Sequence, residues 1–159
     1  MIVYSLLYHT LLFVNIASAG LVTGGAAVMA AAYLPLLIEL SPQETITVHQ
    51  GIGRYIDRWQ PKLAIIAMLT GGVELFFCKE PWQIVCVLGG VSGIFGLSVI
   101  SHMVSVPLSR KIVAWMPAAS EVQLRRMKVQ WIQVHYLRSA CALIGFLFYI
   151  VSVLLLVQF

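Results

Sequence analysis

Four apolar stretches, separated by short polar segments, dominate the pattern of this chain. They cover residues 4–38, 63–77, 82–104 and 136–157. A helix needs about 20 apolar residues to cross the hydrocarbon of a bilayer. Each stretch therefore predicts one crossing, and the second draws on residues 58–62 to gain length. The pattern predicts an all-α fold, a four-transmembrane-helix bundle that forms a single domain over residues 1–159.

The polar segments carry helix signals of their own. Ser41, Pro42 and Glu44 match a capping box, which predicts a short helix that begins there and lies along the cytoplasmic membrane surface. Residues 107–117 predict a second short interfacial helix. Ser120 is an N-cap candidate, and nothing after it interrupts a helix. We therefore expect one long helix whose outer half is the fourth crossing.

Proline and glycine residues mark special positions within the crossings. Pro35 disfavours simple helical continuation in the first stretch, which is longer than a bilayer requires and must tilt or project near residues 33–35. GxxxG spacings occur twice, at residues 20–24 and 89–93. Such spacings let helix backbones approach closely. They predict tight packing within the bundle, with contact between two copies of the chain as the alternative.

Composition and charge agree with a membrane protein and add an orientation. Hydrophobic residues make up 60% of the chain and charged residues 10%, whereas a soluble domain has roughly 25% charged residues. Nine of the ten Lys and Arg residues lie between the first and second stretches, or between the third stretch and the start of the fourth. The positive-inside rule makes those connections cytoplasmic and places both termini outside.

The charge distribution also indicates where the protein is located and which partners it binds. We expect a multi-pass protein of a bacterial inner membrane, with the lipid bilayer as its first partner. The net charge of +4 is explained by orientation and by attraction to anionic lipids, so it does not indicate nucleic-acid binding. No inverted repeat appears in the sequence, which argues against a transporter.

Three histidines fall at the predicted cytoplasmic interface. His102 ends the third stretch, His135 opens the fourth, and His49 lies on the first interfacial helix. Imidazoles titrate near neutral pH and ligate metals and haem, so three at one level raise a haem or metal hypothesis. Their spacing supplies no HxxxH or ExxH motif, and interfacial histidines are also common without a ligand. The sequence therefore predicts no cofactor and leaves this hypothesis open.

A stripe on the long last helix combines three kinds of side chain. Trp131, His135 and Arg138 follow i, i+4, i+7 spacing, which places them on one helix face. They could form a pocket wall for a planar, anionic or phenolic molecule, in which the imidazole removes a proton and the guanidinium stabilises the anion. The alternative is a tryptophan packed at the membrane surface beside an arginine that extends to the headgroups.

A second candidate site lies at the outer side. His9 in the first stretch and Glu74 in the second fall at similar depth, about 6 to 8 Å in at 1.5 Å per residue, so we expect them to meet. Ionisable groups at membrane depth are costly and mark functional sites. A pair of this kind could shuttle a proton or hold a ligand, and it could equally be a structural hydrogen bond between two helices.

The chain resembles the anthrone-oxygenase-like family of small four-helix membrane proteins, many of which have no known function. The resemblance rests on the letters VPLS at residues 106–109, WMPA at residues 115–118, and the spaced Trp131, His135 and Arg138. It extends to the small-residue first stretch and thus over most of the chain. One departure is a serine where the family has asparagine, at the last position of the first motif.

The resemblance implies a bundle fold and, for named family members, oxygen insertion into an electron-rich anthrone to give a quinone without a bound cofactor. It implies His135 as the base, Arg138 as the anion stabiliser and Trp131 as a pocket wall, and we add His102 and His49 as substrate-binding candidates. The expected ligand is a hydrophobic aromatic small molecule. The alternatives are a non-catalytic subunit of a larger membrane complex, a homo-oligomer, or a haem- or metal-binding protein.

Overall fold

Helices joined by short connections make up the described part of the chain. The computed structural model describes residues 2–56, 58–115 and 120–156. Its elements are α1 (Ile2–Val28), the π-helical turn η1 (Met29–Tyr33), α2 (Leu34–Leu37), α3 (Pro42–Tyr55), α4 (Gln60–Glu74), α5 (Pro81–Ile100), the π-helical turn η2 (Ser101–Ser105), α6 (Val106–Val113) and α7 (Glu121–Leu156). The prediction of an all-α helical bundle is confirmed.

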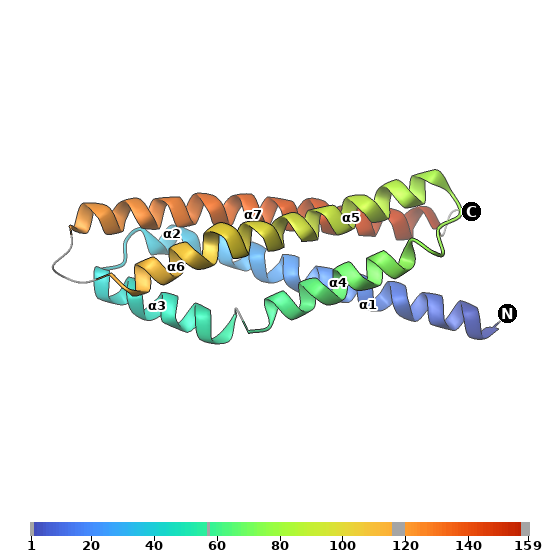
Figure 1. Cartoon of the computed structure of the whole chain (residues 1–159), viewed down its shortest axis with the longest axis horizontal. Helices are drawn as coiled ribbons and strands as arrows, with labels where there is room; N and C mark the ends of the chain where they lie inside the picture. The colour runs from blue at the N-terminus through green and yellow to red at the C-terminus, as the bar shows by residue number, and fades with distance from the viewer. Residues whose placement is uncertain (1, 57, 116–119, 157–159) are drawn as a thin grey trace.

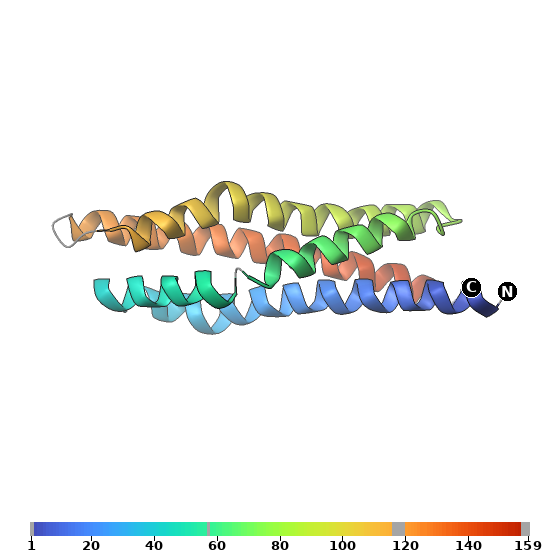
Figure 2. The same cartoon turned by 60° about the horizontal axis from the view of Figure 1, so that its bottom comes forward.

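All helices run roughly along one long axis (Figures 1 and 2). The α1–α2 rod, the α3–α4 segment, the α5–α6 rod and α7 alternate in direction, so both ends of the chain lie at the same end of the bundle (Figure 1). The start of α7 at Glu121 and its unbroken course confirm the predicted long last helix. Residues 116–118 of the family-like motif and residue 157 of the fourth stretch lie outside the described residues.

Three of the helical rods are long and apolar enough to cross a membrane. They cover Leu6–Leu37, Pro81–Val113 and Glu121–Leu155. The second predicted crossing corresponds to α4, whose 15 residues extend about 22 Å at 1.5 Å per residue, less than the roughly 30 Å of hydrocarbon in a bilayer. This helix is short because it ends at Glu74 rather than at residue 77. A crossing by α4 therefore stays a prediction.

Two prolines are accommodated inside the long helices by π-helical turns. Tyr33 ends η1 two residues before Pro35, and Ser105 ends η2 two residues before Pro107. Proline lacks an N–H group and its ring collides with the carbonyl four residues earlier, and the wider π turn relieves that conflict. The predicted separate helix over residues 107–117 is thus corrected, because α6 continues directly from α5.

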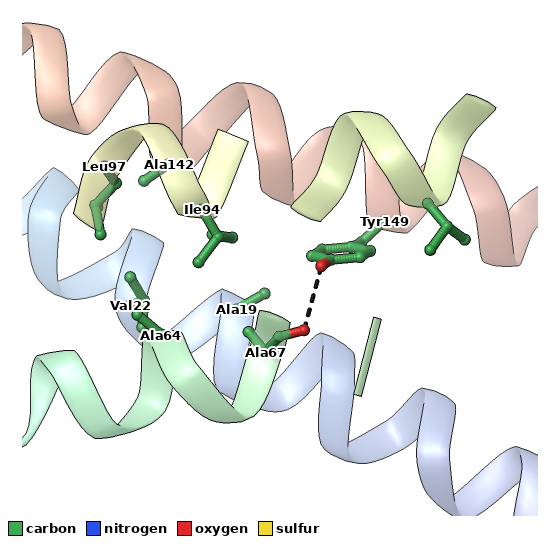
Figure 3. Close-up of a cluster of buried hydrophobic side chains, with 9 residues drawn as sticks. Ala19, Val22, Ala64, Ala67, Ile94, Leu97, Ala142 and Tyr149 are labelled. Atoms are coloured by element: carbon green, nitrogen blue, oxygen red, sulfur yellow. Dashed lines mark hydrogen bonds between the residues drawn. The ribbon is translucent and has the colours of Figure 1, made fainter. Parts of the chain in front are cut away.

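One apolar core lies between α1, α4, α5 and α7 (Figure 3). Tyr149 is fully buried there and donates a hydrogen bond from its hydroxyl to the Ala67 carbonyl across 3.2 Å. Gly93 of α5 meets α7 directly, since a Cβ atom built on it would lie 2.5 Å from Gly145 Cα. The second GxxxG spacing thus packs α5 against α7 within the bundle, whereas a Cβ atom on Gly24 would meet nothing within 4 Å.

A second apolar cluster extends the bundle beyond this core. It comprises Leu34, Leu37, Ile112, Leu124, Trp131 and Ile132. The predicted capping box at Ser41 and Glu44 is confirmed at the start of α3. This helix runs along the bundle axis (Figure 2) and packs against α6, so it does not lie flat on a membrane surface as predicted. The cause is its apolar face, which turns to the cluster through Ile52.

Candidate functional site

A pocket of about 540 Å³ opens between α3, α4, the α5–α6 rod and α7. Its position is at the inner end of the apolar core, because Ala64 and Leu97 belong to that core and also line the pocket. Small-molecule sites in proteins commonly have volumes of roughly 300–1,000 Å³ and mostly apolar walls with a few polar groups. The pocket has both properties.

The floor of the pocket holds a fixed guanidinium group. Arg138 is only 6% exposed and lines the pocket. Its Nη2 donates a hydrogen bond to Gln60 Oε1 across 2.8 Å. Gln60 Nε2 in turn donates to the Val22 carbonyl across 3.3 Å. Charged groups buried at this depth need such partners, and the contacts aim the positive charge of α7 into the pocket.

A buried histidine forms part of the wall opposite. His49 of α3 is 1% exposed and lines the pocket. Its Nδ1 lies 2.9 Å from the Thr45 carbonyl, and because a carbonyl only accepts, Nδ1 carries the hydrogen. Nε2 is buried and has no hydrogen-bond partner within the protein. Burial lowers the pKa of His49 and the Thr45 hydrogen bond offsets part of that effect, so the ring is neutral with its lone pair on Nε2.

The mouth of the pocket carries further positive charge. His102 of η2 and Arg110 of α6 line it and are exposed. Among the described residues that line the pocket there is no Asp or Glu. Since two arginines and, among the described lining residues, no carboxylate face one cavity, the local potential is positive and favours anions.

Trp131 contacts both buried histidines. Its ring lies 4.9 Å from that of His49 and 5.1 Å from that of His135, measured between centroids. His135 is 1% exposed and lines a separate small cavity of about 10 Å³ that also includes Trp131 and Arg138. The predicted stripe of three side chains therefore faces inward as a unit, but only Arg138 of the three lines the larger pocket.

The arrangement bears on the haem or metal hypothesis. Among the described residues, no three His, Cys, Asp or Glu side chains are grouped so that they could hold a metal ion. His49 and His102 line the same pocket. His135 lines a different, smaller cavity, so the three predicted histidines do not line one pocket.

The outer candidates lie at the opposite end of α4. Glu74 is 1% exposed, and the Ser152 hydroxyl lies within hydrogen-bonding range of its carboxyl group. Tyr8 and Cys78 are close enough to interact electrostatically with that carboxyl group. His9 is exposed and contacts the ring of its neighbour Tyr8 at 6.0 Å between centroids. The two predicted partners thus differ in burial, and their pairing stays a prediction.

Of the pocket residues that sequence reasoning missed, Gln60 and Arg110 matter most for the charge of the site. Gln60 had a usable signal, since a polar amide next to Pro61 begins an apolar stretch and polar groups at such ends often have specific partners. Arg110 was counted only as a topology signal. It lies at the pocket mouth because α5 continues through η2 into α6. The proline at position 107 instead suggests that a helix ends there, so the sequence does not predict this continuation.

Comparisons with known protein families, curated proteins and solved structures give no match. The class of protein is therefore defined by the chain itself: a small helical bundle that has, among its described residues, three helices long and apolar enough to span a membrane and a pocket of about 540 Å³.

Proposed function

We propose that the chain crosses the membrane four times, with both termini outside and the basic connections inside. The alternating helices and the common end of both termini (Figure 1) support this topology, as does the gathering of basic residues at the other end. In this proposal α4 and the pocket beside it complete the second crossing. Water in a protein-lined cavity can solvate backbone at membrane depth, so a short helix suffices there.

The pocket then falls at the inner headgroup layer. Counting from the outer ends, Ser101 lies about 20 residues into the α5 rod and Arg138 about 18 residues into α7, which corresponds to roughly 27–30 Å at 1.5 Å per residue. A ligand dissolved in the membrane reaches this depth without leaving the lipid. An amphiphilic aromatic compound, with an apolar ring and a polar edge, fits such a location.

We infer that the protein binds a planar aromatic molecule in this pocket and oxidises it with O₂, as the resemblance to anthrone oxygenases suggests. One observation carries the proposal: His49, whose Nε2 is buried and has no hydrogen-bond partner within the protein, lines the same pocket as Arg138, whose guanidinium is fixed by Gln60. A base and a cation in one mostly apolar pocket can remove a proton from carbon and stabilise the resulting anion. Because His135 does not line this pocket, His49 replaces it as the proposed base.

The proposed reaction needs no further reductant. His49 Nε2 takes a proton from the methylene carbon of the anthrone, and Arg138 stabilises the enolate oxygen that results. The carbanion donates electrons to O₂ and a carbon–oxygen bond forms, giving a peroxide. Loss of the second methylene proton and cleavage of the O–O bond release water and leave a carbonyl group. One oxygen atom of O₂ ends in the quinone and the other in water, so the four-electron oxidation balances.

The test is turnover of a hydroxylated anthrone by the protein in lipid nanodiscs, followed by quinone absorbance and O₂ uptake. We expect His49→Ala to reduce the rate above the spontaneous background at least about 100-fold, since general bases contribute 10²–10⁴. His9→Ala is the matched control, because His9 lies exposed near the opposite end of the bundle, and should retain the rate. Loss of activity in His9→Ala would instead favour the outer site.

His135→Ala distinguishes the two assignments of the base. The proposal expects this variant to lose stability and to retain turnover, because His135 does not line the pocket that includes His49 and Arg138. If His135→Ala abolishes turnover in folded protein while His49→Ala retains it, the base is His135, as the family resemblance implies.

A further inference from the structure

The two arginines of the pocket occupy different positions in it. Arg138 is buried at the floor and is fixed by Gln60. Arg110 is exposed at the mouth, where His102 is also exposed. Arg138 accounts for the single anion that proton removal creates in the proposed reaction. The proposed reaction gives no role to the guanidinium of Arg110, which is exposed at the mouth.

The wall between floor and mouth is mainly apolar. Pro61, Ala64, Leu97 and Val106 line it, and Ala64 and Leu97 are buried in the apolar core of the bundle. A ligand that spans the pocket must therefore present an apolar body to this wall and a charged group at each polar end. Cationic clefts with apolar walls concentrate field lines and attract anions.

We propose that the ligand is an aromatic carboxylate, whose ring system lies against the apolar wall and whose carboxylate is bound at the mouth by Arg110 and His102. The guanidinium of Arg110 offers the planar pair of N–H donors that matches a carboxylate. This inference rests on the proposed function for the ring system and adds the acidic substituent. It makes Arg110 a specificity-determining residue for binding.

Equilibrium binding of a matched, unreactive pair of ligands tests the inference. The probes are anthraquinone-2-carboxylate and anthraquinone-2-carboxamide, which have the same ring system and differ in charge. In nanodiscs of phosphatidylcholine we expect the wild-type protein to bind the carboxylate about tenfold more tightly, the size of one charge-assisted contact. Arg110→Gln should abolish the preference and Arg110→Lys should restore part of it.

Lys111→Gln is the control, because it removes the same charge from the next residue, which is exposed and is not among the residues that line the pocket. It should keep the preference for the carboxylate. Loss of the preference in this variant would assign it to the general surface charge of the protein and overturn the inference. Equal binding of the two probes by the wild type would overturn it as well, while leaving the proposed function intact.

Two further outcomes would exclude an aromatic carboxylate as the ligand. Failure of the wild type to bind either probe would overturn both proposals. Anionic lipid headgroups are chemically similar to the proposed carboxylate, so the measurement is repeated with phosphatidylglycerol in the nanodiscs. We expect the preference to persist. If phosphatidylglycerol abolishes it in the wild type, the mouth binds lipid phosphate and the aromatic carboxylate is excluded.

Discussion

Arg138 on α7 donates a hydrogen bond from Nη2 to Oε1 of Gln60 on α4, across 2.8 Å. The same amide donates to the backbone of α1 at Val22, so one side chain joins three helices at the pocket floor. A buried guanidinium near the membrane core is costly unless it is hydrogen-bonded. The contact that stabilises the bundle at this level is therefore also the contact that orients the charge of the site.

Substitution of Gln60 should separate these two effects. Gln60→Leu removes the acceptor of Arg138, and we expect it to lower the free energy of unfolding by about 1.5–3 kcal/mol, the range for hydrogen bonds to charged groups. Gln60→Glu keeps the acceptor for Arg138, loses the donor to the Val22 carbonyl and compensates the charge of the guanidinium, so it should be more stable than Gln60→Leu and should bind anthraquinone-2-carboxylate more weakly than the wild type. Unfolding in mixed micelles and equilibrium binding provide the two measurements. Wild-type affinity in both variants would contradict the role of Arg138.

Gly93 should tolerate no larger side chain. A Cβ atom there would lie 2.5 Å from Gly145 Cα and 2.7 Å from the Cys141 carbonyl oxygen, and backbone cannot move aside as a flexible side chain can. We expect Gly93→Ala to cost about 1–3 kcal/mol of unfolding free energy by overpacking. Gly24→Ala is the control, since nothing lies within 4 Å of the added carbon. It should be neutral or stabilising, because alanine favours helix.

The sequence predicts the bundle better than it predicts the site, and the reason is physical. Apolar stretches and caps are local signals, so the long rods and the start of α3 at Ser41 follow from them. Pro107 is also a local signal, but it ends a helix only if no π-helical turn accommodates the missing N–H group and the bulk of the ring. Packing against the neighbouring helices decides whether such a turn forms. The inward face of the Trp131 stripe follows from helix periodicity. Which histidine reaches the pocket depends on where α3 docks, and no local pattern encodes that contact.

His49 should make stability depend on pH. In the folded protein its pKa lies below the ordinary value of 6.5 because the ring is buried. Between these two pKa values the unfolded chain binds a proton that the folded protein does not, so the free energy of unfolding falls as pH decreases below about 6.5. For one proton, the slope of the free energy of unfolding against pH has a limit of about 1.4 kcal/mol per pH unit. Titrating stability from about pH 7.5 to 5 measures it.

His49→Gln is the comparison for this titration. Glutamine does not titrate, so the variant should lose part of the slope that the wild type shows below about pH 6.5. Identical slopes in wild type and His49→Gln would mean that His49 is not buried in the folded protein in membranes.

Labelling of single cysteines can decide whether α4 crosses the membrane. Gln43 and Lys79 are exposed and flank the α3–α4 segment, so a crossing by α4 places them on opposite sides. In a background without Cys78, Cys86 and Cys141, a membrane-impermeant maleimide added outside should label Lys79→Cys and spare Gln43→Cys until the membrane is permeabilised.

Gln123→Cys provides the reference for the cytoplasmic side, since only the α5–α6 rod separates Gln123 from Lys79 and that rod is long enough to cross. It should behave like Gln43→Cys. If Gln43→Cys is instead labelled from outside together with Lys79→Cys, α4 does not cross and the chain spans the bilayer three times. The pocket, which α3 helps to line, would then no longer lie on the cytoplasmic side, and its proposed position at the inner headgroup layer would be wrong.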